Sequence, residues 1–191
     1  MLRLIFKLLF KLKGWTIENA FPKESQHCIM VGAPHTSNWD LVFTVASLSL
    51  LKIPMRFTIK KEWLKPPVGW FIKPLGAIGI NRQKPGTGSK EGKVHEIASL
   101  FKKHERLALV ITPEGTRAKS TKIKSGFYHI AKEANVPIAL AYLNYRDKKA
   151  GIGKIIYPEK DFESTLQHLK DFYEKVPAKF PENNSFIGLE I

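Results

Sequence analysis

Apolar and polar positions follow two patterns along the chain, one typical of strands and one typical of helices. Short apolar runs typical of buried strands occupy residues 28–32, 55–59, 77–81, 107–112, 137–143 and 154–157. Stretches with helical spacing occupy residues 37–51, 87–104, 125–134 and 163–175. Alternation of strands and helices is typical of an α/β domain with a largely parallel sheet. We therefore predict a single α/β domain with a mostly parallel, mixed sheet flanked by helices.

The N-terminal segment, residues 1–13, is apolar on nearly every side. Arg3, Lys7 and Lys11 recur every four residues, so on a helix they form one cationic stripe. Such a helix is too short to span a bilayer but suits the bilayer interface. On an anionic leaflet the stripe and Lys13 would add about 3–4 kcal/mol of binding free energy. We predict an amphipathic membrane-surface helix over 1–13 and one domain over 14–191. Docking of the helix on the domain or on a partner is the alternative.

The charge balance indicates an anionic partner. The chain carries 31 Lys and Arg against 17 Asp and Glu, a net charge of +14. Anionic membrane lipids, nucleic acid, an acidic carrier or a phosphorylated substrate would each fit. No apolar stretch reaches the ~18 residues of a spanning helix, and the N-terminus lacks a signal-peptide pattern. The lone Cys28 lies in an apolar run, which predicts a buried thiol. We expect a protein at the cytoplasmic face of the membrane, peripheral or monotopic.

The first candidate for chemistry is the segment from His35 to Asp40, between a predicted strand and a predicted helix. Sites gather at such junctions in open α/β sheets. The imidazole can accept a hydroxyl proton, and a carboxylate on its other nitrogen would fix the tautomer. The alternative is a capping box, Ser37-x-x-Asp40, in which Asp40 holds the helix start. The pattern by itself leaves both open.

Two further candidates follow predicted strands. A turn after residues 107–112 contains Glu114, Gly115, Thr116 and Arg117. Arginine suits phosphate binding and glycine lets the backbone approach an anion, while Lys119, Lys122 and Lys124 keep the surroundings cationic. Arg82 follows the strand predicted over 77–81. The alternative for each is an ordinary turn or a solvated side chain.

In this order, and with Val136-Pro137-Ile138 as a fourth block, the segments resemble the glycerolipid (lysophospholipid or 1-acylglycerol-3-phosphate) acyltransferase family of His-x4-Asp type. The resemblance covers about residues 31–143. It implies that His35 and Asp40 are catalytic. It also implies that the acceptor is bound by Arg82, Glu114, Gly115, Thr116, Arg117 and Lys124. Gly79 departs from the family pattern, in which a bulkier residue is common.

The activity implied by the resemblance is O-acyl transfer in phospholipid biosynthesis. His35 would deprotonate the hydroxyl of a lysophospholipid-like acceptor, above all 1-acylglycerol-3-phosphate. The hydroxyl would then attack the thioester of acyl-carrier protein or acyl-CoA. No cofactor or metal is expected beyond this co-substrate.

A basic nucleic-acid-binding protein without acyl transfer activity is the alternative from another class. The sequence pI of about 9.8 and the four tryptophans are compatible with it. However, the first basic residues alternate with Leu, Ile and Phe, an apolar surface that phosphate binding does not need. No known nucleic-acid-binding motif is present, so we do not expect nucleic acid as a partner.

Overall fold

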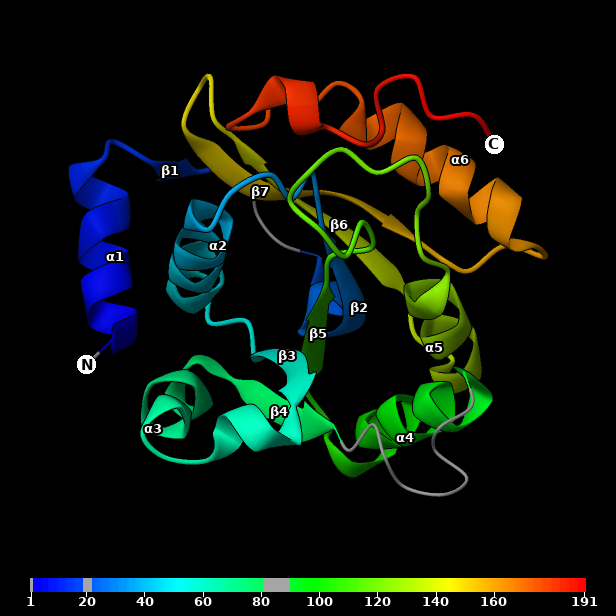
Figure 1. Ribbon diagram of the computed structural model, residues 1–191, viewed down its shortest axis with the longest axis horizontal. Helices are drawn as coiled ribbons and strands as arrows, with labels where there is room; N and C mark the ends of the chain where they lie inside the picture. The colour runs from blue at the N-terminus through cyan, green and yellow to red at the C-terminus, as the bar shows by residue number, and fades with distance from the viewer. Residues whose placement is uncertain (1, 19–21, 81–89) are drawn as a thin grey trace.

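A seven-stranded sheet forms the centre of the computed structural model, which describes residues 2–18, 22–80 and 90–191 (Figure 1). Its strands are β1 (Thr16–Ile17), β2 (His27–Gly32), β3 (Met55–Lys60), β4 (Ala77–Ile80), β5 (Leu107–Ile111), β6 (Ile138–Asn144) and β7 (Lys149–Ile156). The spatial order is β1-β7-β6-β2-β5-β3-β4, and every neighbouring pair except β6 and β7 is parallel. The predicted α/β domain with a mostly parallel, mixed sheet is confirmed.

Helices connect these strands. The α-helices are α1 (Leu2–Leu12), α2 (Trp39–Leu50), α3 (Val68–Ile72), α4 (Lys90–Lys103), α5 (Gly126–Ala134) and α6 (Phe162–Tyr173). Short 3-10 helices are η1 (Lys23–Gln26), η2 (Lys61–Leu64), η3 (Lys73–Leu75) and η4 (Pro181–Asn183). α2 ends ahead of Pro54 in a left-handed cap: Lys52 has a φ of +56°, and the Ile53 N–H donates to the Leu48 carbonyl at 3.0 Å.

The core lies on both faces of the sheet, because successive side chains of a strand point to opposite sides. Ile29 and Val31 of β2 pack in one cluster with residues of α4, α5 and α6. Cys28 and Met30 pack in another with residues of α2. Cys28 is fully buried, as predicted, and burial raises the pKa of its thiol to about 12.

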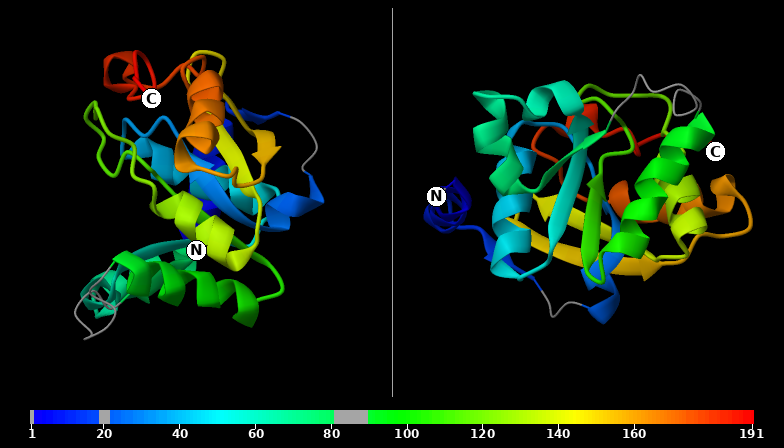
Figure 2. Two further views of the ribbon diagram at one scale, coloured as in Figure 1. Left: turned by 90° about the vertical axis from the view of Figure 1, so that its right-hand side faces the viewer. Right: turned by 90° about the horizontal axis from the view of Figure 1, so that it is seen from below.

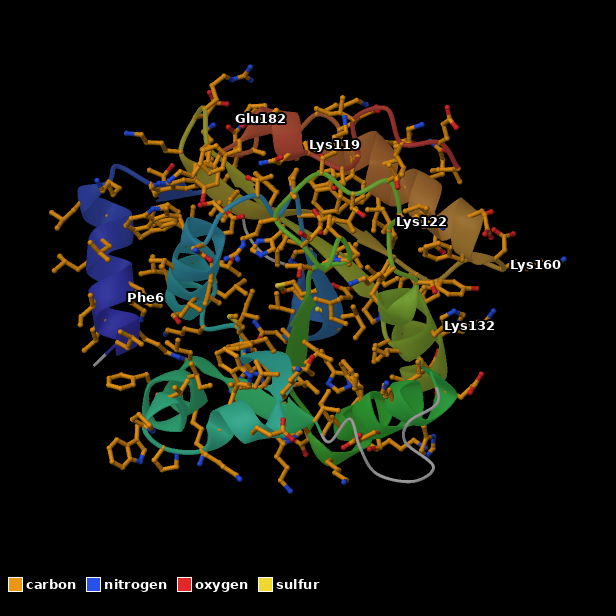
Figure 3. The ribbon with its side chains drawn as sticks, viewed as in Figure 1. Phe6, Lys119, Lys122, Lys132, Lys160 and Glu182 are labelled. Atoms are coloured by element: carbon orange, nitrogen blue, oxygen red, sulfur yellow. The ribbon has the colours of Figure 1, made fainter. Side chains whose placement is uncertain are left out.

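α1 forms an outer layer beyond α2, at one side of the molecule (Figures 1 and 2). Phe6 points from α1 toward α2 (Figure 3), and Phe10 is buried beside Phe43 of α2. Leu4, Leu8 and Leu12 stay exposed on the opposite side of α1. The helix is thus docked on its own domain along one face and leaves a second apolar face uncovered.

Two regions differ from the sequence prediction. β7 begins at Lys149 and not at residue 154, because Asn144 and Asp147 hydrogen-bond across a tight turn that pairs β7 antiparallel with β6. The proline-rich stretch from 61 to 75, for which the sequence predicted neither a strand nor a helix, forms η2, α3 and η3. The two-residue β1 carries too short a pattern to be predicted. Residue 81 of one predicted strand and 87–89 of one predicted helix fall outside the described residues.

Candidate active site

The candidate site lies where β6, β2 and β5 end. These strands are neighbours and parallel, so their carboxyl ends meet at one edge of the sheet. His35 follows β2, Glu114 follows β5, and Tyr145 follows β6 directly. Residues far apart in sequence are thereby brought to one place, as expected for an open parallel sheet.

Asp40 holds the ring of His35. Nδ1 of His35 lies 3.0 Å from Oδ2 of Asp40, and the two side chains are 22% and 9% exposed. The same oxygen accepts 2.9 Å hydrogen bonds from the backbone N–H groups of Thr36 and Ser37. Asp40 therefore holds the loop before α2 as a capping residue would, and it also contacts the histidine. One carboxylate therefore makes both of the contacts that the sequence left open, one with the ring of His35 and one with the backbone at the start of α2.

Glu114 supports the backbone of His35. Its Oε1 accepts a 2.9 Å hydrogen bond from the His35 N–H, and its side chain is buried. Burial raises the pKa of this carboxyl above its ordinary value, although the hydrogen bond from His35 acts in the opposite direction. The other oxygen, Oε2, is buried without a hydrogen-bond partner among the described residues. These contacts place Glu114 under the His35 loop rather than among exposed groups that could meet an acceptor.

Tyr145 is a site residue that the sequence reasoning missed. Its hydroxyl donates a 2.6 Å hydrogen bond to Oδ1 of Asp40, and burial raises the pKa of that hydroxyl. Its ring packs edge-on against Trp15 at 4.9 Å and lies near Phe43. The available signal was its place one residue beyond the strand predicted over 137–143. A lone tyrosine after a strand carries no chemistry of its own, so nothing singled it out.

The turn after β5 carries a group of cationic side chains that form a rim of the site, and Figure 3 labels two of them, Lys119 and Lys122. Gly115 has a φ of +64°, and a Cβ there would collide with the Lys124 side chain, so Lys124 lies directly over the glycine backbone. Arg117 is exposed, and Thr116 accepts a 3.3 Å hydrogen bond from the N–H of Ala118. None of the cationic side chains of this turn has a carboxylate partner within the described ranges: Arg117, Lys119, Lys122 and Lys124. They leave an unneutralised positive field at the site.

A cleft of about 830 Å³ connects these groups. Its polar part is lined by His35, Asp40, Gly115, Arg117 and Lys124. Its apolar part extends between α2, β3 and α4 and is lined by residues including Leu41, Leu48, Met55, Phe57 and Ile97. The arrangement offers a proton acceptor, a cationic rim and an apolar recess in a single space.

Some predictions are not addressed by this geometry. Arg82 lies outside the described residues. In the part of the chain that the structure describes, no group of three or more His, Cys, Asp or Glu side chains is placed to hold a metal ion. No helix there combines the length and apolar character needed to cross a bilayer.

Comparison with known proteins identifies the protein family. The model of the family described as Acyltransferase matches residues 16–142, so this chain belongs to that family. A solved structure with a similar fold is the 1-acyl-sn-glycerophosphate (LPA) acyltransferase PlsC from Thermotoga maritima, with a TM-score of 0.60 and 17% sequence identity. The match covers 90% of this chain and 75% of that one. Among curated proteins, none matches this sequence significantly.

Proposed function

We propose that this acyltransferase moves a fatty acyl group from a thioester donor to the hydroxyl of a lysophospholipid-like acceptor at a membrane surface. The observation that carries the proposal is the His35–Asp40 hydrogen bond at the mouth of a cleft with a cationic rim. Family membership supports acyl transfer as the reaction. 1-Acylglycerol-3-phosphate is the acceptor we favour, because its phosphate fits the rim of Arg117 and Lys124.

The proton transfer follows from the direction of the His35–Asp40 bond. A carboxylate only accepts hydrogen bonds, so Nδ1 of His35 carries the hydrogen and Nε2 keeps its lone pair. Nε2 takes the proton of the acceptor hydroxyl while the hydroxyl oxygen attacks the thioester carbonyl carbon. The new C–O ester bond forms, the C–S bond breaks, and the imidazolium returns the proton to the departing thiolate. General-base action of this kind contributes about 10²–10⁴-fold to rate.

Membrane binding is assigned to the outer face of α1. Leu4, Leu8 and Leu12 lie one turn apart and are exposed, and Lys11 is exposed on the same helix. Apolar side chains at the acyl boundary with lysines at the headgroups define an interfacial helix. Such a helix would hold the cleft close to an acceptor that itself resides in the bilayer.

Acyl transfer from both thioester donors tests the proposal. Labelled acyl-carrier protein and acyl-CoA are each offered with a panel of lysolipids, one of them 1-acylglycerol-3-phosphate, to the full chain and to His35→Ala. We expect transfer to an anionic lysolipid and its loss in the variant, while His104→Ala serves as the control, because His104 is exposed and does not line the cleft. Equal transfer by the His35 variant would refute the catalytic assignment.

A further inference from the structure

A second apolar surface lies between β3 and β4, outside the candidate active site. Its large side chains are exposed by 60%, 42%, 68% and 61%, in the order Trp63, Val68, Trp70 and Phe71. These four residues of η2 and α3 are called the aromatic patch below. Single exposed apolar side chains are ordinary, but several large ones gathered in one short segment of the chain indicate an interaction site.

Exposed lysines flank the residues of the aromatic patch along the chain. The exposed cations of this segment are Lys60, Lys61, Lys65 and Lys73, whereas Glu62 is its acidic residue. Tryptophan is enriched where one end of the side chain meets lipid and the other meets water. Lysines beside it are attracted to anionic headgroups. The composition fits a partner with an anionic surface and an apolar interior.

The segment that carries the patch is clamped to the sheet. The backbone of Gly69 lies against the Leu64 carbonyl so closely that a Cβ would collide with it, and the Gly69 N–H donates to Lys65 O at 2.9 Å. The Leu64 side chain lies over Gly79 of β4, where a Cβ would come within 2.6 Å of it. This contact explains why β4 carries a glycine at position 79. A fixed backbone spares the patch an ordering cost on binding.

α3, which carries most of the aromatic patch, and α1 lie at the same side of the molecule, away from α6 and the C-terminus (Figures 1 and 2). The guanidinium of Arg3 in α1 lies beside Gly76, where η3 ends. β3 links the aromatic patch to the cleft, because Phe57 and Thr58 of this strand line the cleft and the strand continues directly into η2.

We infer that the aromatic patch inserts into the same anionic phospholipid bilayer as α1 and forms the second half of the membrane-binding surface. The inference rests on the proposed transfer at a membrane. Trp63, Trp70 and Phe71 are each exposed by 60% or more, so they project from the surface. Projecting side chains are suited to penetrate a lipid–water interface. An acidic protein helix would instead require a groove on this surface in which to bind. Two separated contacts fix the tilt of the domain on the bilayer, which one helix does not.

Site-specific fluorescence tests insertion without any need for activity. Cys28 is fully buried, so the full-length Trp70→Cys variant can be labelled at position 70 with an environment-sensitive dye. With vesicles of phosphatidylglycerol and phosphatidylcholine in equal parts, we expect a blue shift and quenching by brominated acyl chains. The matched control is Ile187→Cys, an exposed apolar position near the C-terminus, which should show neither change. A dye at position 70 that stays in water while the protein sediments with vesicles would overturn the inference. So would a blue shift produced only by an acidic acyl-carrier protein.

An activity comparison separates this surface from the catalytic site. Trp70→Ser with Phe71→Ser should reduce transfer to a lysolipid embedded in those vesicles about tenfold or more. Transfer to a short-chain, water-soluble lysolipid should not change, and neither rate should change in Tyr157→Ser with Ile187→Ser. Equal loss on both acceptors, or no loss on either, would overturn the inference. Absence of transfer by the unmodified chain would instead refute the proposed function and leave the fluorescence result standing.

Discussion

The hydroxyl of Tyr145 donates to Oδ1 of Asp40 at 2.6 Å, while Oδ2 of the same carboxylate meets the ring of His35. The loops after β2 and β6 therefore converge on one side chain. The backbone N–H groups of Thr36 and Ser37 complete its set of donors. Asp40 is oriented by contacts that do not depend on the bound substrate, which is the preorganisation that general-base catalysis needs.

Removal of the Tyr145 hydroxyl should reduce turnover and leave substrate binding nearly intact. A hydrogen bond to a charged group contributes about 1.5–3 kcal/mol, so Tyr145→Phe should lower kcat roughly 10- to 100-fold. Steady-state kinetics checks this. Tyr128→Phe is the matched control, because its buried hydroxyl donates to the carbonyls of Glu159 and Lys160, outside the cleft. A similar fall in kcat for both variants would assign the effect to general stability.

His35 and Asp40 should behave as one unit. His35→Ala should lower kcat by about 10²–10⁴-fold, the range of general-base action. Asp40→Asn should also lower it, because an amide can donate to Nδ1 and so favour the wrong tautomer. In the double variant the losses should not add, since groups that act together are non-additive. Fully multiplicative losses in kcat would contradict a shared role.

Glu114 gives a prediction about stability and pH. Burial raises its pKa in the folded state above the ordinary value of 4.5, so folding is penalised once this carboxyl must ionise. The stability that the folded state gains with this carboxyl neutral is fully present below pH 4.5 and is lost as the pH rises through the raised pKa. Glu114→Gln keeps an acceptor for the His35 N–H but does not ionise. The native chain should therefore lose stability relative to Glu114→Gln by up to about 1.4 kcal/mol per pH unit in that window.

Urea unfolding at a series of pH values measures this difference. The control is Glu105→Gln, because Glu105 is exposed. A difference in unfolding free energy between the native chain and Glu114→Gln that stays constant with pH would show that the carboxyl is not penalised by burial.

Gly115 should not tolerate a side chain. Its φ of +64° costs other residues about 1–2 kcal/mol, and a Cβ would meet the side chain of Lys124. Gly115→Ala should therefore lower the unfolding free energy by at least this amount and raise KM for an anionic acceptor by displacing Lys124. For the stability readout Gly126→Ala is the comparison, because a Cβ there meets nothing within 4 Å. Equal unfolding free energies for the two variants would argue against a constrained turn.

The sequence predicted those features that a local pattern can encode. The apolar runs of β2, β5 and β6 and the position of His35 after β2 follow from alternation and strand length, and the structure confirms them. Contacts between segments far apart in the sequence could not be predicted from local patterns. Nothing local to Tyr145 indicates that it meets Asp40, and nothing near Glu114 shows that it lies beneath His35. Likewise, no local pattern accounts for a glycine at position 79, where the absent side chain makes room for Leu64.

The aromatic cluster between α1 and the active site changes how the N-terminal helix can be studied. Phe10 of α1 packs against Trp15 and Phe43, and both rings contact Tyr145, whose hydroxyl reaches Asp40. Removal of the helix would open a void beside Trp15 and Phe43, which pack against Tyr145, and would also remove the proposed anchor. A truncated protein that lost activity would thus report damaged architecture and lost localisation together. Substitutions of the exposed Leu4 and Leu8 would test the proposed lipid contact while the aromatic support of Asp40 stays in place.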